Sequence, residues 1–324
     1  MDLQLTHVED VFLKLEATEG TDATCAGTDT IQLLKPATIT FGAEQMNPRD
    51  DLHNQVLDIA QPLSPAAKYA EITMVGQIRW LGSAYSASAF PEIHSLLQAF
   101  GFSATFSVNK WIYDTASTSL KTATIYGFRG TAQGNFVKHV ITAARGKTLT
   151  IKFPAGQPAE FTAVIRGIFN QPTDVANLVP TYQTAAPPLF EAAGGSFSLG
   201  SFSTGVVRDT TITIDSPLQA RLSANVADAL AGYQQTKRTV TFEASFEAGR
   251  VSDYDLYTQW KTAAGQALAI ALGSASNNKL AVAASTATIQ DAPLYKDENG
   301  LWLYGVKGIC TPEGTNRMNL QFTA

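Results

Sequence analysis

The chain has 324 residues, of which 45% are hydrophobic and 16% are charged, and it carries a formal net charge of −5. This composition excludes a disordered chain, because enough apolar residues are present to build sizeable cores. The acidic balance argues against a conventional nucleic-acid binder, which carries a basic patch or groove. The length suits two domains of about 150 residues each. The low charged fraction fits a surface covered by copies of the same chain, although a secreted β-protein would show the same bias.

Targeting and cysteine signals are weak. No run of about 18 apolar residues is present, so we predict no transmembrane helix and no membrane partner. The first 20 residues lack the basic region and apolar core of a signal peptide. The two cysteines, Cys25 and Cys310, are too few for a disulfide framework or a zinc site, and we do not expect them to form a bridge.

The first 68 residues predict short strands separated by turns. Strands are expected at residues 11–15, 31–34 and 37–45, and the Gly- and Asp-rich residues 20–29 are expected to form an exposed loop. Residues 47–68 contain three prolines and mixed polarity. We interpret them as a long excursion between two strands, and loops of that length usually have a function or are disordered.

Residues 69–106 show the clearest local pattern, a strand followed by one amphipathic helix. Alternate positions of the strand are apolar: Ile72, Met74, Gly76, Ile78 and Trp80. This period of two predicts one buried and one solvated face. The helix is expected over residues 90–99, with Gly101 ending it. Its apolar face is formed by Ile93, Leu96, Leu97 and Phe100.

Further strands follow the helix, and a linker follows the strands. The strands are expected at residues 121–128, 136–143, 148–153 and 160–169, with Gly-rich turns between them. Short strands with one helix among them are typical of an antiparallel β-rich domain. Residues 170–195 are rich in Pro, Ala and Gly and have no strand period. We therefore predict a first domain at 1–172, a linker at 173–195 and a second domain at 196–324.

The second half repeats this order of elements. Strands are expected at residues 196–202, 206–214, 239–248, 267–272, 280–290 and 301–310. A polar excursion at 215–237 precedes the strand at 239–248, and a helix is expected at 253–264. For that helix, Ser252 is the expected N-cap and Gly265 the expected stop.

The two halves can be aligned on these patterns. Residues 71–80 match 239–248 at an offset of 168, residues 90–101 match 254–265 at 164, and residues 162–169 match 303–310 at 141. Identity is low, so chance similarity between amphipathic strands is the alternative. The ordered recurrence of strand, helix and closing strand favours internal duplication. The predicted fold is mainly β, with two tandem β-sandwich or barrel domains and one flanking α-helix in each.

No motif for catalysis, nucleotide binding or metal binding is present. The four histidines are scattered: His7, His53, His94 and His139. None has a neighbour at ligand spacing, and His94 is expected to be solvated or at an interface. The carboxylates Asp50 and Asp51 lie in the first excursion, where a solvated loop is a simpler interpretation than an acid–base pair or a metal site. We therefore predict no catalytic, cofactor-binding or metal-binding residues, and a protein that is not an enzyme.

Four segments carry a resemblance to a known family. They are LEATEGTDATCAGTDTIQLLKPATIT at 15–40, SLLQAFGF at 95–102, TAARGKTLTIKF at 142–153 and FTAVIRGIFNQPTD at 161–174. They are similar, in order, to an E-T-x-x-G-T-D opening, a LLRACGF-like helix end, a GARG strand turn and an F…GxYxxPxD segment. With them the chain resembles the tail tube (major tail) proteins of long non-contractile tailed phages and prophages. Gln98-Ala99-Phe100 stands where that family more often has Arg-Ala-Cys.

The resemblance implies a structural virion protein made in the bacterial host cytoplasm. Such proteins form rings that stack into a hollow tail tube, through which genomic DNA passes without tight binding. The implied partners are other copies of the chain, the tape measure protein, and the tail terminator and distal tail proteins. With two tube domains in each chain, a trimer with pseudo-six-fold symmetry is favoured over a hexamer.

The same resemblance suggests which residues face the channel and which reach the next ring. The candidate lumen-facing residues are Glu71, Thr73, Gln77, Thr241, Glu243, Ser245 and Glu247. The excursions at 42–68 and 215–237 are candidate inter-ring arms. The residues singled out in the first arm are Arg49, Asp50, Asp51 and His53. The alternatives are another tube-fold tail component (a terminator or distal tail protein), a secreted β-rich adhesin or carbohydrate-binding module, and, less favoured, a β-sandwich hydrolase.

Overall fold

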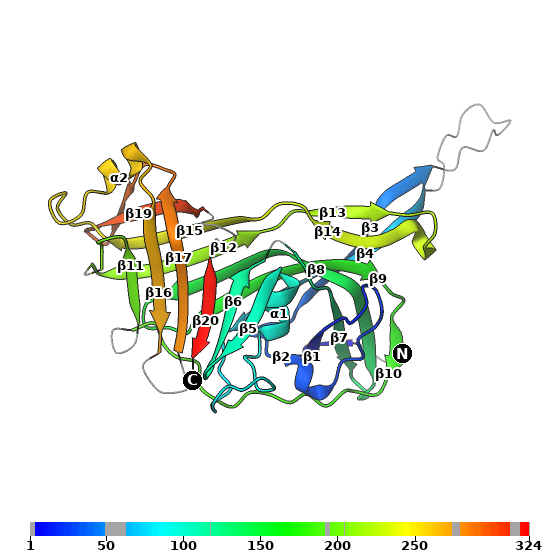
Figure 1. The fold of residues 1–324 in the computed structure, drawn as a ribbon. Helices are drawn as coiled ribbons and strands as arrows, with labels where there is room; N and C mark the ends of the chain where they lie inside the picture. Colours follow the sequence, from blue (N-terminus) through cyan, green and yellow to red (C-terminus); the bar gives the residue numbers. More distant parts are fainter. Residues whose placement is uncertain are drawn as a thin grey trace.

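The computed structural model describes residues 4–48, 63–116, 118–191, 195–203, 205–273, 279–311 and 318–323. Within these residues the fold is mainly β with two α-helices, which confirms the predicted class (Figure 1). The first half contains β1 (Gln4–Leu15), β2 (Thr30–Ile31), β3 (Thr38–Pro48), β4 (Leu63–Gln77), α1 (His94–Ala99), β5 (Phe102–Ser107), β6 (Lys110–Thr115), β7 (Ala123–Thr131), β8 (Phe136–Pro154), β9 (Glu160–Phe169) and β10 (Thr173–Val175). The second half contains β11 (Ser196–Leu199), β12 (Val207–Asp215), β13 (Leu218–Leu222), β14 (Leu230–Gln235), β15 (Thr239–Glu247), α2 (Leu256–Thr262), β16 (Gln266–Leu272), β17 (Lys279–Ile289), β18 (Leu294–Glu298), β19 (Leu301–Cys310) and β20 (Asn319–Thr323).

One antiparallel layer runs through both halves. Its strand order is β3–β4–β9–β8–β12–β15–β19–β18, and the halves meet where β8 pairs with β12. We call this layer the long sheet. In its inner strands, from β4 to β19, alternate residues are buried, so one face packs on the core. The other face is less buried and carries the polar partners of each alternating pair.

A second layer covers the core face and also spans both halves. Its strand order is β5–β6–β20–β17–β16–β11. The strands β2, β1 and β7 pair in a row of their own that joins the first part of β8, and they pack on the same core. The C-terminal β20 lies between β6 of the first half and β17 of the second (Figure 1). Its Phe322 packs edge-on against Trp80 and Tyr113, with ring centroids 5.4 Å and 5.7 Å away. Sheets and core thus cross the proposed boundary, and the division into two domains with a linker stays a prediction.

β8 is one strand of 19 residues rather than the two strands and turn that residues 143–147 predict. It bends at Ala143, whose φ is 50°, and passes from one layer to the other. The buried Glu16 carboxylate holds the bend, since it accepts hydrogen bonds from the Ala143 amide (2.8 Å) and from the Thr122 and Thr124 hydroxyls (2.7 and 3.0 Å). The glutamate of the E-T-x-x-G-T-D segment is therefore a structural residue.

Helix α1 lies inside the sandwich rather than on its outer flank. It contacts β1, β5 and β8, and its predicted apolar face is fully buried. The Phe100 ring packs on Gly146 of β8, where no side chain would fit. The helix begins at His94 rather than at residue 90, and Gly101, with φ of 80°, follows its end as predicted. The one helix predicted for the first half is thus confirmed, and it packs against β1, β5 and β8.

Helix α2 is shorter than the sequence predicts and has different caps. Asp255, not Ser252, accepts the N-terminal hydrogen bond, from the Thr258 amide at 2.9 Å. The left-handed residue at the C-terminus is Ala263, with φ of 49°, rather than Gly265. Among the described residues no helix is long and apolar enough to cross a membrane.

Both predicted excursions contain regular pairing. β3 extends through Pro48 and β4 begins at Leu63, so the first excursion is largely a strand hairpin in its described part. The second forms the hairpin β13–β14. β5, β6, β18 and β20 were also missed as strands, because their pairing partners outweigh their weak local patterns. β18 and β19 are joined by a tight turn, with φ of 53° at Asn299 and 85° at Gly300.

A first prediction concerns Gly308 in β19. A Cβ there would lie 2.5 Å from the Thr288 carbonyl oxygen and would also meet the Phe242 ring, whereas at Gly305 in the same strand the nearest atom is 3.9 Å away. We expect Gly308→Ala to lower the free energy of unfolding by about 1–3 kcal/mol and Gly305→Ala to change it by less than about 0.5 kcal/mol. Urea unfolding of the two variants measures this, and equal losses would contradict the packing argument.

A second prediction concerns His94, which was expected to be solvated or at an interface. Its Nδ1 lies 2.8 Å from the Tyr113 hydroxyl and its ring stacks on Phe90 at 4.3 Å. Burial lowers the pKa of His94 to about 4. The unfolded chain therefore binds more protons between pH 6.5 and 4, and His94 should remove up to about 3 kcal/mol of stability as the pH falls through that window.

The measurement is the urea midpoint of the parent protein and of His94→Asn between pH 4 and 7.5. The parent should lose more stability on acidification than the variant does, although the variant starts lower. Glu92, whose pKa is raised to about 7 mainly by burial, changes the stability in the opposite direction as the pH falls. Because Glu92 is present in both proteins, its contribution cancels in the difference between them. Parallel profiles would show that His94 does not titrate in the folded state as described.

Candidate assembly surface

The junction between the halves is a complete strand pairing. β12 pairs with β8 over seven residues, from Asp209 opposite Pro154 to Asp215 opposite Thr148. On the core side, Ile212 and Ile151 face each other and are fully buried. On the other side the Thr148 hydroxyl donates to the Asp215 carboxylate at 2.9 Å. The junction thus has an apolar inner face and a polar outer face, as within a single sheet.

The hairpin β13–β14, which we call the second arm, crosses from the second half onto the first (Figure 1). Its Leu230 and Tyr233 form a small apolar cluster with Ala67 of β4, and Tyr69 and Ile168 pack against it. At the base of the arm, Arg238 donates to the Phe100 and Gly101 carbonyls at the end of α1 (3.2 and 2.9 Å). The arm therefore fastens the second half to the first.

Arg166 of β9 is the centre of the polar contacts under this arm. Its Nε donates to Glu71 at 2.9 Å and its Nη1 to Glu44 at 3.1 Å. Its guanidinium lies 4.2 Å from the centre of the Tyr69 ring. The Tyr233 hydroxyl of the arm donates to the same Glu44 carboxylate at 2.7 Å, and burial and this hydrogen bond raise the pKa of Tyr233. One cation thus joins β3, β4, β9 and the arm.

The predicted lumen residues all lie on the non-core face of the long sheet. In β4 they alternate with the buried Ile72 and Met74, and in β15 with the buried Phe242 and Phe246. Their carboxylates are paired on that face. The pairs are Glu71 with Arg166 and Lys147 (2.9 and 3.2 Å), Glu243 with Lys307 (2.6 Å), and Glu247 with Arg208 (2.9 Å). Such pairing leaves this face without a strong field of one sign.

The residues predicted to reach the next ring lie in the chain between β3 and β4. Arg49, Asp50, Asp51 and His53 lie outside the described residues. The strands that lead to them are β3 and β4, whose pairing continues to Pro48 opposite Leu63. Figure 1 shows these strand ends projecting away from the rest of the chain. Their role as an arm stays a prediction.

The sequence reasoning missed the two edges of the long sheet. In the described part of the chain β3 pairs with β4 alone and β18 with β19 alone. Every residue of β18 is exposed, and large apolar side chains are exposed near both edges, one at the β3 edge and four at the β18 edge. They are Phe41 on β3, Leu294 and Tyr295 on β18, and Leu301 and Trp302 on β19. The sequence contains a signal for these residues, because aromatic and aliphatic residues flank the Asn-Gly turn. Only the sheet topology, however, shows that these residues lie at an edge.

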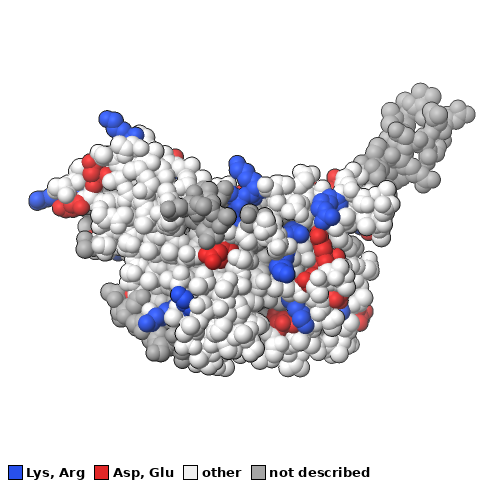
Figure 2. All heavy atoms as spheres, in the orientation of Figure 1, with Lys and Arg blue, Asp and Glu red and all other residues white. Residues whose placement is uncertain are grey.

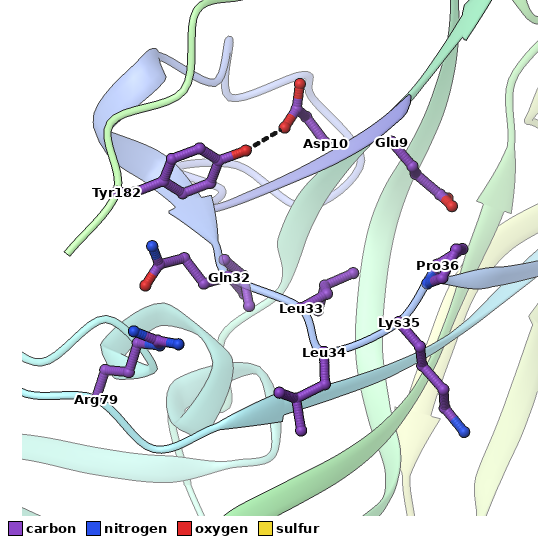
Figure 3. Close-up of a pocket in the computed structure, with 10 residues that line it drawn as sticks. Glu9, Asp10, Gln32, Leu33, Leu34, Lys35, Pro36, Arg79 and Tyr182 are labelled. Carbon is purple, nitrogen blue, oxygen red and sulfur yellow. Dashed lines mark hydrogen bonds between the residues drawn. The ribbon is translucent and has the colours of Figure 1, made fainter. Parts of the chain in front are cut away.

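A pocket with a volume of about 370 Å³ lies between β1 and residues 32–36. Figure 3 shows Tyr182 donating to Asp10 at one end, 2.5 Å apart, with Arg79 beside Gln32 at the other. Burial raises the pKa of the lining Glu9. No serine, cysteine or histidine is among the described residues that line it. The pocket therefore has no nucleophile of those types with a base beside it.

Other chemistry-bearing groups are dispersed over the described residues. Nowhere in that part of the chain do three His, Cys, Asp or Glu side chains come together as metal ligands. Cys25 and Cys310 are both free, and burial raises the pKa of each thiol to about 12. The visible surface shows few charges, with both signs interspersed (Figure 2). The largest candidate functional surfaces among the described residues are thus the edges of the long sheet and the hairpin arms, rather than a pocket.

Comparison with known proteins agrees with this picture. A family model described as phage tail tube protein matches residues 8–298, which is most of the chain. No match was found among curated proteins.

A third prediction tests the attachment of the second arm. Arg166→Ala removes two charged hydrogen bonds and the contact with Tyr69, so we expect a loss of about 1–3 kcal/mol in the free energy of unfolding. Trypsin should also cut faster after Arg221, which lies in the arm. Arg208→Ala is the matched control, because Arg208 pairs with Glu247 away from the arm. Equal cleavage rates in both variants would show that Arg166 does not hold the arm.

Proposed function

This chain belongs to the phage tail tube protein family, and from that premise we propose that it assembles with copies of itself into stacked rings that form the hollow tail tube. Phage DNA leaves through the centre of that tube. The family is one of structural tail proteins. The protein is accordingly a virion component, made in the host cytoplasm before assembly.

The observation that best supports this proposal is the long sheet with two open edges. An isolated sheet with exposed apolar edge strands is a template for pairing with another chain. Closing sheets edge to edge into a barrel removes every such edge. The edge strands β3 and β18 lie at opposite ends of the long sheet, so only a ring of several chains can close the sheet into a barrel.

The strand count favours three chains over six. Eight strands from each of three chains give 24 strands. At about 4.8 Å between strands and a tilt of about 40°, such a barrel has a backbone diameter of roughly 48 Å. A ring of six chains would be about twice as wide. The smaller barrel still admits a DNA duplex, so we favour a trimer with pseudo-six-fold symmetry.

The non-core face of the long sheet would then line the channel. This places Thr73, Gln77, Thr241 and Ser245 toward the DNA, together with the paired carboxylates Glu71, Glu243 and Glu247. Hydroxyls and balanced ion pairs give phosphates no continuous basic track to bind, which suits a conduit. At one end of this face the second arm covers Tyr69 and Ile168, so the exposed wall begins beyond them.

The first excursion, with Arg49, Asp50, Asp51 and His53, would reach the neighbouring ring. The second arm supports this role, because it already shows a hairpin of this chain lying across a sheet outside its own half. The family further implies the tape measure protein inside the tube and the terminator and distal tail proteins at its ends. A tail terminator or distal tail protein would share the fold without forming long tubes, and a secreted adhesin would remain monomeric.

Electron microscopy and mass measurement of the purified protein test the proposal. We expect tubes with a central hole, and rings of three chains after mild dissociation. A variant with residues 49–62 replaced by a short Gly-Ser turn should form rings that do not stack. Shortening residues 224–227 in the turn of the second arm is the matched control.

The alternatives give different outcomes. Rings of six chains would contradict the trimer, single rings that never stack would favour a terminator, and monomers at high concentration would contradict self-assembly altogether. Normal tubes from the variant lacking residues 49–62 would remove that segment from the ring-to-ring contact.

A further inference from the structure

The strand register of the first half recurs in the second half at constant offsets. The five pairs between the end of β8 and β9 are Thr148–Val164, Leu149–Ala163, Thr150–Thr162, Ile151–Phe161 and Lys152–Glu160. The five pairs between β18 and β19 are Leu294–Gly305, Tyr295–Tyr304, Lys296–Leu303, Asp297–Trp302 and Glu298–Leu301. Each β18 residue comes 146 positions after its β8 counterpart, and each β19 residue 141 positions after its β9 counterpart.

The inner strands repeat in the same way. Glu71 of β4 pairs with Arg166 of β9, and 172 and 141 positions later Glu243 of β15 pairs with Lys307 of β19. Both pairs are carboxylate–cation pairs on the non-core face. The register therefore relates β4 to β15 at 172, four residues from the offset of 168 that the hydrophobic patterns suggest.

β3 and β12, the first strands of the two halves of the long sheet, are related by a constant offset as well. Thr40 of β3 is opposite Glu71, and 171 and 172 positions later Thr211 of β12 is opposite Glu243. β12 thus stands in the second row where β3 stands in the first. The rows β3–β4–β9–β8 and β12–β15–β19–β18 are equivalent, strand for strand.

One strand pairing of the first row has no counterpart within the chain. β8 pairs on its far side with β12, whereas its counterpart β18 has no partner there among the described residues. The strand equivalent to β12 is β3, whose outer edge is also without a partner in the described part of the chain. These two edges lie at opposite ends of the long sheet and cannot meet in one molecule.

We propose that β18 of one chain pairs antiparallel with β3 of the next chain, in the register that β8 and β12 already use. This inference rests on the proposed function and identifies the partner of the exposed edge as a second copy of this chain. Within the chain, Thr211 is opposite Lys152 and Thr213 is opposite Thr150. Applying the offsets of 171 (β3 to β12) and 146 (β8 to β18) to these pairs places Thr40 opposite Glu298, Phe41 opposite Asp297 and Gly42 opposite Lys296 of the neighbouring chain.

The burial of side chains at the positions that the register makes equivalent also supports this seam. Ile212 is 0% exposed in the junction between the halves, whereas its counterpart Phe41 on β3 is 51% exposed. Leu149 is 1% exposed, and its counterpart Tyr295 on β18 is 53% exposed. Trp302 is 59% exposed, whereas its counterpart in β9, Phe161, is 1% exposed. At these three positions a large apolar side chain is thus uncovered in the strands next to the free edges, whereas its counterpart next to the junction is buried.

The seam also accounts for the exposed apolar side chains of β18, Leu294 and Tyr295, which precede the charged Lys296, Asp297 and Glu298 in the same strand. Soluble β-proteins protect edge strands with charges, prolines or bulges, because a bare edge recruits other strands. Burying Phe41, Tyr295 and Trp302 against the neighbouring chain would supply the apolar contact, and the backbone pairing would supply direction and register.

Cysteine cross-linking tests the register. Opposed residues in an antiparallel pair have Cβ atoms about 4.5–5.5 Å apart, close enough for a disulfide or a very short thiol cross-linker. Assembled Thr40→Cys/Glu298→Cys protein should give covalent dimers and trimers under oxidation, ending at the number of chains in the ring. The matched control, Thr40→Cys/Leu294→Cys, places the second thiol about 14 Å further along the same face of β18 and should not cross-link.

The outcomes separate this inference from the proposed function. Tubes that cross-link through Thr40/Glu298 but not through Thr40/Leu294 support the seam. Tubes that cross-link only in the control, or in neither variant, overturn the register and leave the tube function intact. Failure of the parent protein to assemble would instead count against the proposed function. Cys25 and Cys310 are buried. The variants with only Thr40→Cys or only Glu298→Cys measure any cross-linking that involves these two native thiols.

A charge reversal gives a second readout that does not depend on thiol geometry. Thr40→Glu opposes Glu298 in the proposed seam and should raise the concentration needed for assembly about threefold or more. Adding Glu298→Lys should restore it. Both positions are exposed in the single chain, so its unfolding midpoint should not change. No effect of Thr40→Glu, or no rescue, would contradict the proposed seam.

Discussion

The bend of β8 is the constraint on which the rest of the structure depends. Before the bend β8 pairs mainly with β7 and β10, with β9 joining at Ile141 and Thr142, and after the bend it pairs mainly with β9 and β12, so one strand joins both layers and both halves. The left-handed Ala143 costs backbone energy, and the buried Glu16 carboxylate offsets that cost by accepting the Ala143 amide. Without this bend, β12 would have no edge on which to dock.

Continuity of the long sheet links the fold to its proposed role. A sheet of two equivalent rows already contains one junction of the kind a ring needs, formed between β8 and β12. The chain then presents unpartnered edges at both ends, and the arm over Arg166 fixes how the two rows sit. Stability and assembly thus use the same interaction, antiparallel pairing with an apolar core face and a polar outer face.

Much of the local structure could be predicted, because it depends on neighbours in sequence. The alternation around Ile72 and Met74 identifies their buried face correctly, and Gly101 follows the end of α1 as expected. The ends of α2 were wrong, because Asp255 caps it and Ala263 adopts the left-handed conformation where the sequence favours Ser252 and Gly265. Capping patterns express a preference, and packing of the surrounding chain selects among them.

The sequence by itself determined the β-rich class, the buried face of each central strand, the absence of recognisable catalytic motifs and the resemblance that the family match bears out. Only the tertiary structure decided that β8 is one bent strand, that β12 joins it, and that β3 and β18 are left as edges. The physical reason is that alternation and turns act over a few residues, whereas strand pairing joins positions more than fifty apart in the chain, such as Thr148 and Asp215. Which strand is an edge depends on every pairing at once, and no local pattern contains that information.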